Sequence, residues 1–242
     1  MTLEGATNNT NSVAPLTLFQ RVFGSGRVVS RGAVFWENQS AVTGAITGGV
    51  TVDTGTLTVS RRGSQRVLAS GPLEVKGGAV LVVRPTFQPF DASSSLLVRP
   101  SGSVRVVNFG GASQLKVSTV ELQEASIGVD SLCSMHISGN LAVSGVTLSS
   151  IGIGSPSATL AFTSPSHTID VPTGSRLAIN ALGITFATGI IHKIGAGTLD
   201  LNGRTDFDSG LSVDAGDVRF FADTNIGSFG LDAQETVVTL NG

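Results

Sequence analysis

The stretch "KIGAGTLDLNG", residues 193–203, places two alternating leucines directly after a glycine. Alternation with a period of two is typical of a β-strand with one buried face, and a glycine permits a tight corner before such a strand. The same phrase recurs along the chain. The glycines that begin its copies are Gly55, Gly78, Gly102, Gly139, Gly197 and Gly216, and Gly174 begins a copy that is offset by one residue. The opening stretch is therefore one unit of a repeat.

The spacing of the copies predicts how the units are arranged. Where copies follow one another most closely, they are separated by 23, 24, 23 and 19 residues. Internal repeats with a period in the twenties are the signature of a solenoid, in which stacked coils cover each other's apolar surface. We therefore expect an all-β, single-stranded parallel β-helix, and dividing 242 residues by a period of about 22 gives roughly eleven coils. An antiparallel jelly roll does not require one phrase at near-constant separation, and a β-propeller repeats at about 40 residues, usually with aromatic signatures that are missing here.

The alternation also predicts which side chains face the core. We expect inward columns formed by Leu57, Val59, Val80, Val82, Val104, Val106, Leu199 and Leu201. Their alternate neighbours, expected to face outward, are Thr58, Leu81, Arg105 and Asp200. Leu81 is the one apolar residue that does not fit this assignment.

Two regions follow from the repeat. Residues 1–40 are expected to form an N-terminal capping segment and the first coils, because a solenoid needs its first edge covered and Phe19, Phe23, Phe35 and Trp36 gather there. Residues 41–242 are expected to form the β-helical repeats. The final phrase, "TVVTLNG", ends in mid-strand, so we expect the repeats to continue in a longer protein.

Composition and charge limit the possible classes. The net charge of −2 and the pI near 5.9 argue against a nucleic-acid-binding protein. Residues 1–121 hold eleven Lys and Arg and six Asp and Glu, a net charge of +5, whereas residues 122–242 hold four and eleven, a net charge of −7. No run of 18 apolar residues that could form a transmembrane helix is present, and the first residues lack the pattern of a secretory signal. Cys133 is the only cysteine, and we expect it to be a small core residue.

Residues 189–220 resemble the autotransporter-associated β-strand repeat, whose pattern reads roughly K-x-G-x-G-T-L-x-L-x-G, then G-x-x-V-x-x-G. The positions that fall on it are Lys193, Gly195, Gly197, Thr198, Leu199, Leu201, Gly203, Gly210, Val213 and Gly216. The usual middle section of the repeat is replaced by "RTDFDSG", with Phe207 at the aromatic position. The resemblance implies a right-handed β-helical segment of a surface-displayed or secreted passenger protein. It implies no particular chemistry.

The candidate sites are weak. Six aspartates gather in the last quarter of the chain: Asp200, Asp206, Asp208, Asp214, Asp217 and Asp223. Asp206 and Asp208 lie two residues apart and would share a face of a strand, where a ladder with Asp200 and Asp223 from an adjacent coil would bind Ca²⁺ weakly or provide acid–base groups. Aspartates beside glycines are most often solvated turn residues, so we assign no catalytic, cofactor-binding or metal residue. His136 and His192 alternate with apolar residues, and we expect them to be hydrogen-bonded strand residues.

The sequence therefore predicts a non-enzymatic stalk or adhesin-like segment of a larger cell-surface or secreted protein, without a cofactor. Its expected partners are a host or neighbouring cell surface, a glycan, or further copies stacked end to end. The alternatives are a self-assembling filament subunit, for which an intracellular location stays open, and a fibre that binds or cleaves polysaccharide.

Overall fold

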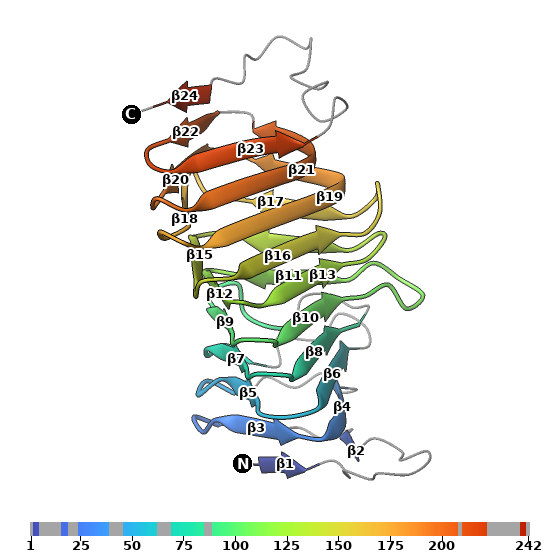
Figure 1. Cartoon of the computed structure of the whole chain (residues 1–242). Helices are drawn as coiled ribbons and strands as arrows, with labels where there is room; N and C mark the ends of the chain where they lie inside the picture. Colours follow the sequence, from blue (N-terminus) through green and yellow to red (C-terminus); the bar gives the residue numbers. More distant parts are fainter. Residues whose placement is uncertain are drawn as a thin grey trace.

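Short parallel strands stack in chain order from the N-terminal end to the C-terminal end of the molecule (Figure 1). The computed structural model describes residues 2–4, 16–18, 24–38, 46–61, 69–84, 89–207, 210–221 and 238–240. These residues form strands, turns and irregular segments, and none of them is helical. Within them, no helix is long and apolar enough to cross a membrane.

The first side of the stack is an eleven-stranded sheet. Its strands, in spatial order, are β1 (Thr2–Glu4), β3 (Val28–Arg31), β5 (Val50–Val52), β7 (Leu73–Val75), β9 (Leu96–Val98), β12 (Val120–Gln123), β15 (Leu141–Ser144), β18 (Ser166–Asp170), β20 (Ile190–Ile194), β22 (Leu211–Val213) and β24 (Val238–Leu240). Neighbouring strands are parallel, so that Leu73 lies opposite Leu96 and Leu96 lies opposite Val120. Parallel neighbours that are one winding apart in sequence define a β-solenoid.

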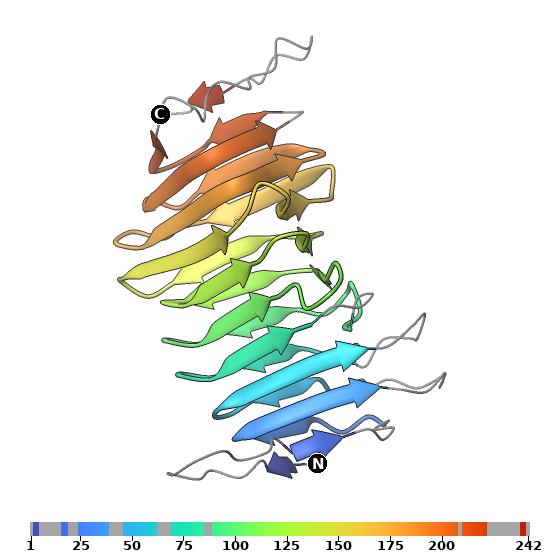
Figure 2. The same ribbon diagram turned by 90° about the vertical axis from the view of Figure 1, so that its right-hand side faces the viewer.

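The second sheet has thirteen strands and forms the remaining sides. Its main ladder consists of β2 (Leu16–Leu18), β4 (Ala33–Asn38), β6 (Thr56–Arg61), β8 (Val80–Val83), β10 (Ser103–Val106), β13 (Ser126–Val129), β16 (Leu148–Ile153), β19 (Arg176–Ala187), β21 (Thr198–Phe207) and β23 (Asp217–Phe221). A shorter ladder consists of β11 (Gln114–Val117), β14 (Ser134–Ile137) and β17 (Thr159–Phe162). The long strand β19 pairs with β16 along its first half and with β17 along its second, and thereby joins the two ladders (Figures 1 and 2).

These pairings confirm the all-β class and the parallel β-solenoid. About seven turns are described in full or nearly so, fewer than the roughly eleven coils expected. The first sheet has eleven strands, but the windings at both ends pass through residues outside the described ranges. Dividing the chain length by the period treats every residue as part of a regular coil, and this division overestimates the number of complete turns.

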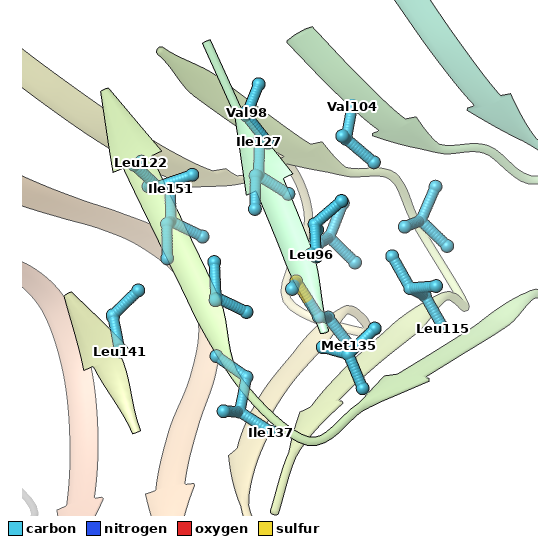
Figure 3. Close-up of a cluster of buried hydrophobic side chains, with 14 of the residues drawn as sticks. Leu96, Val98, Val104, Leu115, Leu122, Ile127, Met135, Ile137, Leu141 and Ile151 are labelled. Carbon is cyan, nitrogen blue, oxygen red and sulfur yellow. The ribbon is translucent and has the colours of Figure 1, made fainter. Parts of the chain in front are cut away.

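One apolar core runs along the inside of the stack. In β10, Val104 and Val106 are buried and Arg105 between them is exposed, as the alternation predicts. Side chains from both sheets meet in this core, and Figure 3 shows Leu96 and Leu122 from the first sheet near Ile127 and Met135 from the second. Leu57, Val59, Leu199 and Leu201 are also buried, as expected.

One prediction of side-chain direction and one prediction of solvent exposure are wrong. Val80 and Val82 are only half-buried, whereas Leu81 and Val83 are buried. Leu57 pairs with Leu81, because the turn before β8 contains one more residue than the turn before β6 and shifts the strand by one position. A shift of one residue exchanges the two faces of a strand, so Leu81 is an ordinary core residue. Asp200, which was expected to face solvent, is fully buried.

The repeat glycines occupy two kinds of position. Gly55, Gly78, Gly174 and Gly216 have positive φ angles at the corner between the two sheets, and the φ of Gly55 is 72°. At Gly197 a side chain is excluded by lack of space, since an added Cβ would lie 2.2 Å from the carbonyl oxygen of Pro172. Gly102 and Gly139 are likewise close to neighbouring carbonyl oxygens. In the copy of the repeat that begins at Gly102, the residue with positive φ is Ser101 (φ 61°), one position earlier.

The proposed capping segment, residues 1–40, is described only in part. Phe19 and Phe23 lie outside the described residues. Trp36 belongs to β4 and is buried in the core, with 1% of its surface exposed.

Candidate functional site

The acidic residues singled out from the sequence do not form one described cluster. Asp206 lies on β21, where it pairs through its backbone with Phe186, and Asp208 falls outside the described residues. Asp214 is partly exposed and contacts the ring of His192, with 3.1 Å between Oδ2 and Nδ1. Within the described residues, no group of three or more His, Cys, Asp or Glu side chains is placed to hold a metal ion.

Asp200 is a buried half of an ion pair. Its side chain is inaccessible to solvent and accepts a hydrogen bond from the guanidinium of Arg176 on the neighbouring strand β19. Its Oδ1 atom is buried without a hydrogen-bond partner. Because a charge without a partner is costly to bury, Arg176 is required to keep this carboxylate inside the protein.

Lys193 is also buried, and it shows why lysine suits this point of the repeat. On β20 it occupies an inward position between Ile169 and Val213 of the adjacent strands. Its Nζ donates hydrogen bonds to three carbonyl oxygens, those of Ile194 at 2.9 Å, Gly195 at 2.6 Å and Ala215 at 2.9 Å. Burial lowers the pKa of the ammonium group, against the opposing effect of nearby carboxylates. The lysine therefore ties together the corners of two successive coils.

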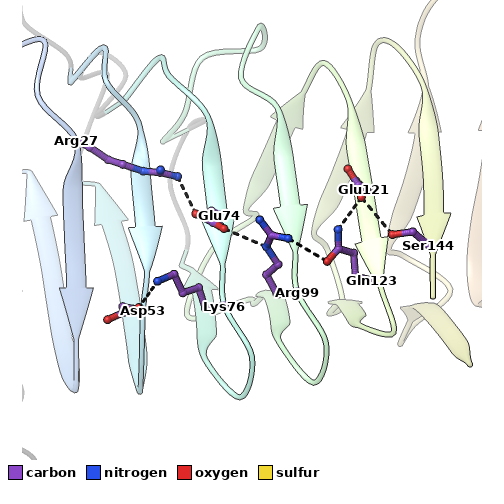
Figure 4. A network of polar contacts seen from close by, with 8 residues as sticks. All are labelled: Arg27, Asp53, Glu74, Lys76, Arg99, Glu121, Gln123 and Ser144. Carbon is purple, nitrogen blue, oxygen red and sulfur yellow. Dashed lines mark hydrogen bonds and ion pairs between the residues drawn. The ribbon is translucent and has the colours of Figure 1, made fainter. Parts of the chain in front are cut away.

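A row of polar side chains crosses the outer face of the first sheet along the solenoid axis (Figure 4). Glu74 accepts hydrogen bonds from Arg27, at 2.9 Å, and from Arg99, at 3.1 Å. Arg99 also donates to the amide oxygen of Gln123, at 3.3 Å. We call these residues, together with Glu121 and Ser144 below, the axial ladder.

Toward the C-terminal end, the axial ladder continues through uncharged hydrogen-bond donors. Glu121 accepts hydrogen bonds from Gln123, at 2.7 Å, and from the hydroxyl group of Ser144, at 3.2 Å. Since Arg27 precedes β3 and Ser144 ends β15, the ladder spans six successive strands of the first sheet. Both of its carboxylates are engaged by neighbouring coils.

A second ionic group lies beside the lower part of the axial ladder. Asp53 contacts Lys76 at 2.6 Å and Arg31 at 2.8 Å. Hydrogen bonds from Lys76 and then from Arg31 lower the pKa of Asp53 below its usual value. One carboxylate thus connects three successive coils, those of β3, β5 and β7.

The axial ladder borders a groove of about 490 Å³ over β7, β9, β12 and β15. One edge carries Ser95, Thr119 and Asn140, and the apolar residues Leu97 and Ala142 also line it. Glu74 and Glu121 belong to strands separated by one intervening strand, a distance along the axis of about 10 Å. The arrangement can hold coils together and offers hydrogen-bonding groups to a ligand in the groove.

The histidines and the cysteine are placed separately. His136 lies on β14 near Gln114, and burial, followed by the charge of Lys116, lowers its pKa. His167 is buried and contacts the carbonyl oxygen of Gly139 at 2.8 Å. Cys133 is a core residue, as expected, and burial raises the pKa of its thiol.

Comparison of the chain with protein-family models, with curated proteins and with solved structures found no significant match.

The axial ladder was not found by sequence reasoning, although the spacing of its members is a signal that could have revealed it. Its members come from neighbouring windings, and Glu74 and Arg99 are 25 residues apart. Aligning the outward positions by strand pairing, instead of searching for local clusters, would have brought them together.

Proposed function

We propose that this chain is a non-enzymatic structural stalk, a rigid β-helical segment of a larger cell-surface or secreted protein. The observation that carries the proposal is the axial ladder, which spans six successive strands on the outer face of the first sheet and links side chains from the coils of five of them. Its carboxylates bind neighbouring coils, which is a structural use of charged groups.

The placement of the hydrogen bonds supports a role in resisting tension along the axis. In a solenoid the backbone hydrogen bonds run between coils and therefore along the long axis. The corner lysine, Lys193, adds a contact in the same direction, because it reaches the carbonyl oxygen of Ala215 in the following coil. Each of these contacts resists separation of the coils.

The proposal includes two expectations from the resemblance to autotransporter-associated repeats. The coil is right-handed, as nearly all parallel crossover connections are. The segment is displayed at the cell surface or secreted, and it presents its loops to another surface or to a glycan.

Small-angle X-ray scattering tests the stalk directly. Deleting residues 103–125 removes 23 residues and brings Ser126 to the position of Ser103, its partner in the adjacent strand. A stalk should fold and shorten by about 4.8 Å. A control deletion of residues 103–113, about half a winding, should disrupt the stacking. A folded variant without axial shortening would contradict the proposal, as would polysaccharide turnover that is lost in Glu121→Gln.

A second candidate function, a self-assembling filament subunit, is favoured by one observation. Because the coils follow one another in chain order, the excess of positive charge in residues 1–121 and of negative charge in residues 122–242 is separated along the axis. Opposite ends of two copies would attract each other, and salt would weaken this attraction. Light scattering over a salt series tests it: filaments should form at low salt, and a monomer under those conditions would exclude it.

A further inference from the structure

The guanidinium group of Arg84 lies over two aromatic rings and forms no ion pair with an acidic residue among the described residues. It directly follows β8, and its backbone nitrogen donates to the carbonyl oxygen of Val59 at 2.9 Å. Its Cζ atom lies 4.3 Å from the ring centre of Phe109 and 5.4 Å from that of Phe35. The described residues give its side chain no hydrogen bond and no ion pair, and its Nε atom is buried without a partner.

The two rings approach Arg84 from different levels of the solenoid. Phe35 belongs to β4, two strands toward the N-terminal end, and Phe109 follows β10, one strand toward the C-terminal end. Such contacts stabilise the cation but give its N–H groups no hydrogen-bond acceptor, because a ring attracts the charge through its face. The guanidinium is therefore positioned but not neutralised.

The surroundings favour an anionic ligand with a ring. Phe109 is 68% exposed, the second most exposed of the large apolar side chains in the described residues. Arg105 lies on β10, the strand next to β8, points outward and makes no ion pair within the described part of the chain. A planar guanidinium binds a carboxylate through two parallel hydrogen bonds, and the exposed phenyl ring can pack against the C–H face of a sugar.

We propose that Arg84 and Phe109 form a binding site for acidic glycans, with Arg84 pairing with the carboxylate of a uronic acid and Phe109 packing against its sugar ring. Arg105 adds a second cation for the next acidic unit along the chain. Asp130 directly follows β13, two strands from β8 toward the C-terminus, and occupies the position in its coil that corresponds to Arg84. Its negative charge limits the anion-binding site on that side. The proposal deepens the stalk function by naming the ligand class that this surface would contact.

A binding assay with defined oligosaccharides tests this site. A galacturonic acid tetramer should bind, and the galactose tetramer, which lacks the carboxylates, should bind at least roughly tenfold more weakly. Arg84→Gln should weaken binding of the acidic tetramer by a similar factor. Arg84→Lys should also weaken it, because lysine keeps the charge but loses the planar fork. Phe109→Ala should weaken binding of the acidic tetramer severalfold.

Lys116→Gln is the matched control. It removes one positive charge from β11, a strand of the shorter ladder of the second sheet, and should leave binding unchanged. The proposal is overturned if the acidic tetramer does not bind, if Arg84→Gln binds it like the wild type, or if a single-stranded oligonucleotide binds more tightly. Circular dichroism of each variant checks that the fold is intact. Because scattering measures the rod independently, failure here is distinguishable from failure of the stalk proposal.

Discussion

The corner between the two sheets contains a repeated backbone conformation that can be tested by exchanging residues between coils. Gly32, Gly55, Gly78, Ser101 and Glu124 all have positive φ and follow one another at intervals of 23 residues. Three of these residues are glycines, for which the conformation carries no steric cost. Ser101, with a φ of 61°, and Glu124, with a φ of 50°, adopt it at a cost.

Ser101→Gly should therefore stabilise the protein. A side chain in the left-handed region costs roughly 1–2 kcal/mol, and glycine loses about 0.5–1 kcal/mol more backbone entropy on folding. The difference leaves about 0.5–1 kcal/mol of stabilisation, a rise in melting temperature of about 1–4 °C for a chain of this size. Gly78→Ser is the reverse exchange, one winding away, at a site where an added Cβ meets nothing within 4 Å. It should destabilise by a similar amount.

Two further variants separate conformation from contact. Glu124→Gly should give a smaller gain, because the carboxylate accepts a hydrogen bond from the backbone nitrogen of Val146 at 3.0 Å. Gly55→Ala should cost more than Gly78→Ser, because its Cβ would lie 2.5 Å from the carbonyl oxygen of Gly32. Thermal melts followed by circular dichroism measure all four. A destabilised Ser101→Gly variant beside a neutral Gly78→Ser variant would refute the reasoning.

Five other substitutions test the core, the corner and the ionic contacts. Leu81→Ala should lower the free energy of unfolding by about 2–5 kcal/mol and Val80→Ala by less than about 1 kcal/mol, because only Leu81 is buried; equal losses in urea titrations would place the strand in the other register. Lys193→Met should cost about 2–3 kcal/mol by leaving corner carbonyl groups unpaired. Because the folded-state pKa of Lys193 is lowered from 10.5, the wild type should gain stability over this variant as the pH rises through the folded pKa toward 10.5; a constant difference would contradict this assignment. Glu74→Gln should cost about 1 kcal/mol or less, and the loss should vanish in roughly 1 M salt; a loss independent of salt would show that these contacts are not ionic. The contribution of Asp53, whose pKa is lowered, should be present above pH 3.8 and disappear as the pH falls through its folded pKa, and an acid titration in which Asp53→Asn unfolds like the wild type would disprove it.

The repeat carried most of the fold information in the sequence. A glycine followed by alternating apolar residues, at intervals in the twenties, predicts parallel coils, and Val104 and Val106 are buried as that pattern requires. The position of each strand was less predictable. One additional residue in the turn before β8 exchanges the faces of Val80 and Leu81, and nothing in the local alternation "AVLVV" distinguishes the two registers.

Polar residues that are buried or paired between coils were the least predictable features. Asp200 alternates with two leucines and was expected to face solvent, but Arg176 of the preceding coil covers it. Glu74 and Arg99 have no local relation in the sequence and meet only because the two strands are stacked. Such contacts depend on the register of whole windings, which the sequence pattern defines only approximately.

Disulfide cross-linking between adjacent coils tests the stacking itself. Thr58 lies opposite Val82 and Thr56 lies opposite Val80, all on the outward face of β6 and β8. In a Cys133→Ser background, the cysteine pairs 56/80 and 58/82 should each oxidise readily, because opposite residues of parallel strands are about 4.8 Å apart. The diagonal pair 58/80 should not, since its Cα atoms would be more than about 7 Å apart. Cross-linking of 58/80, or of only one of the two opposite pairs, would contradict parallel stacking of the coils in this register.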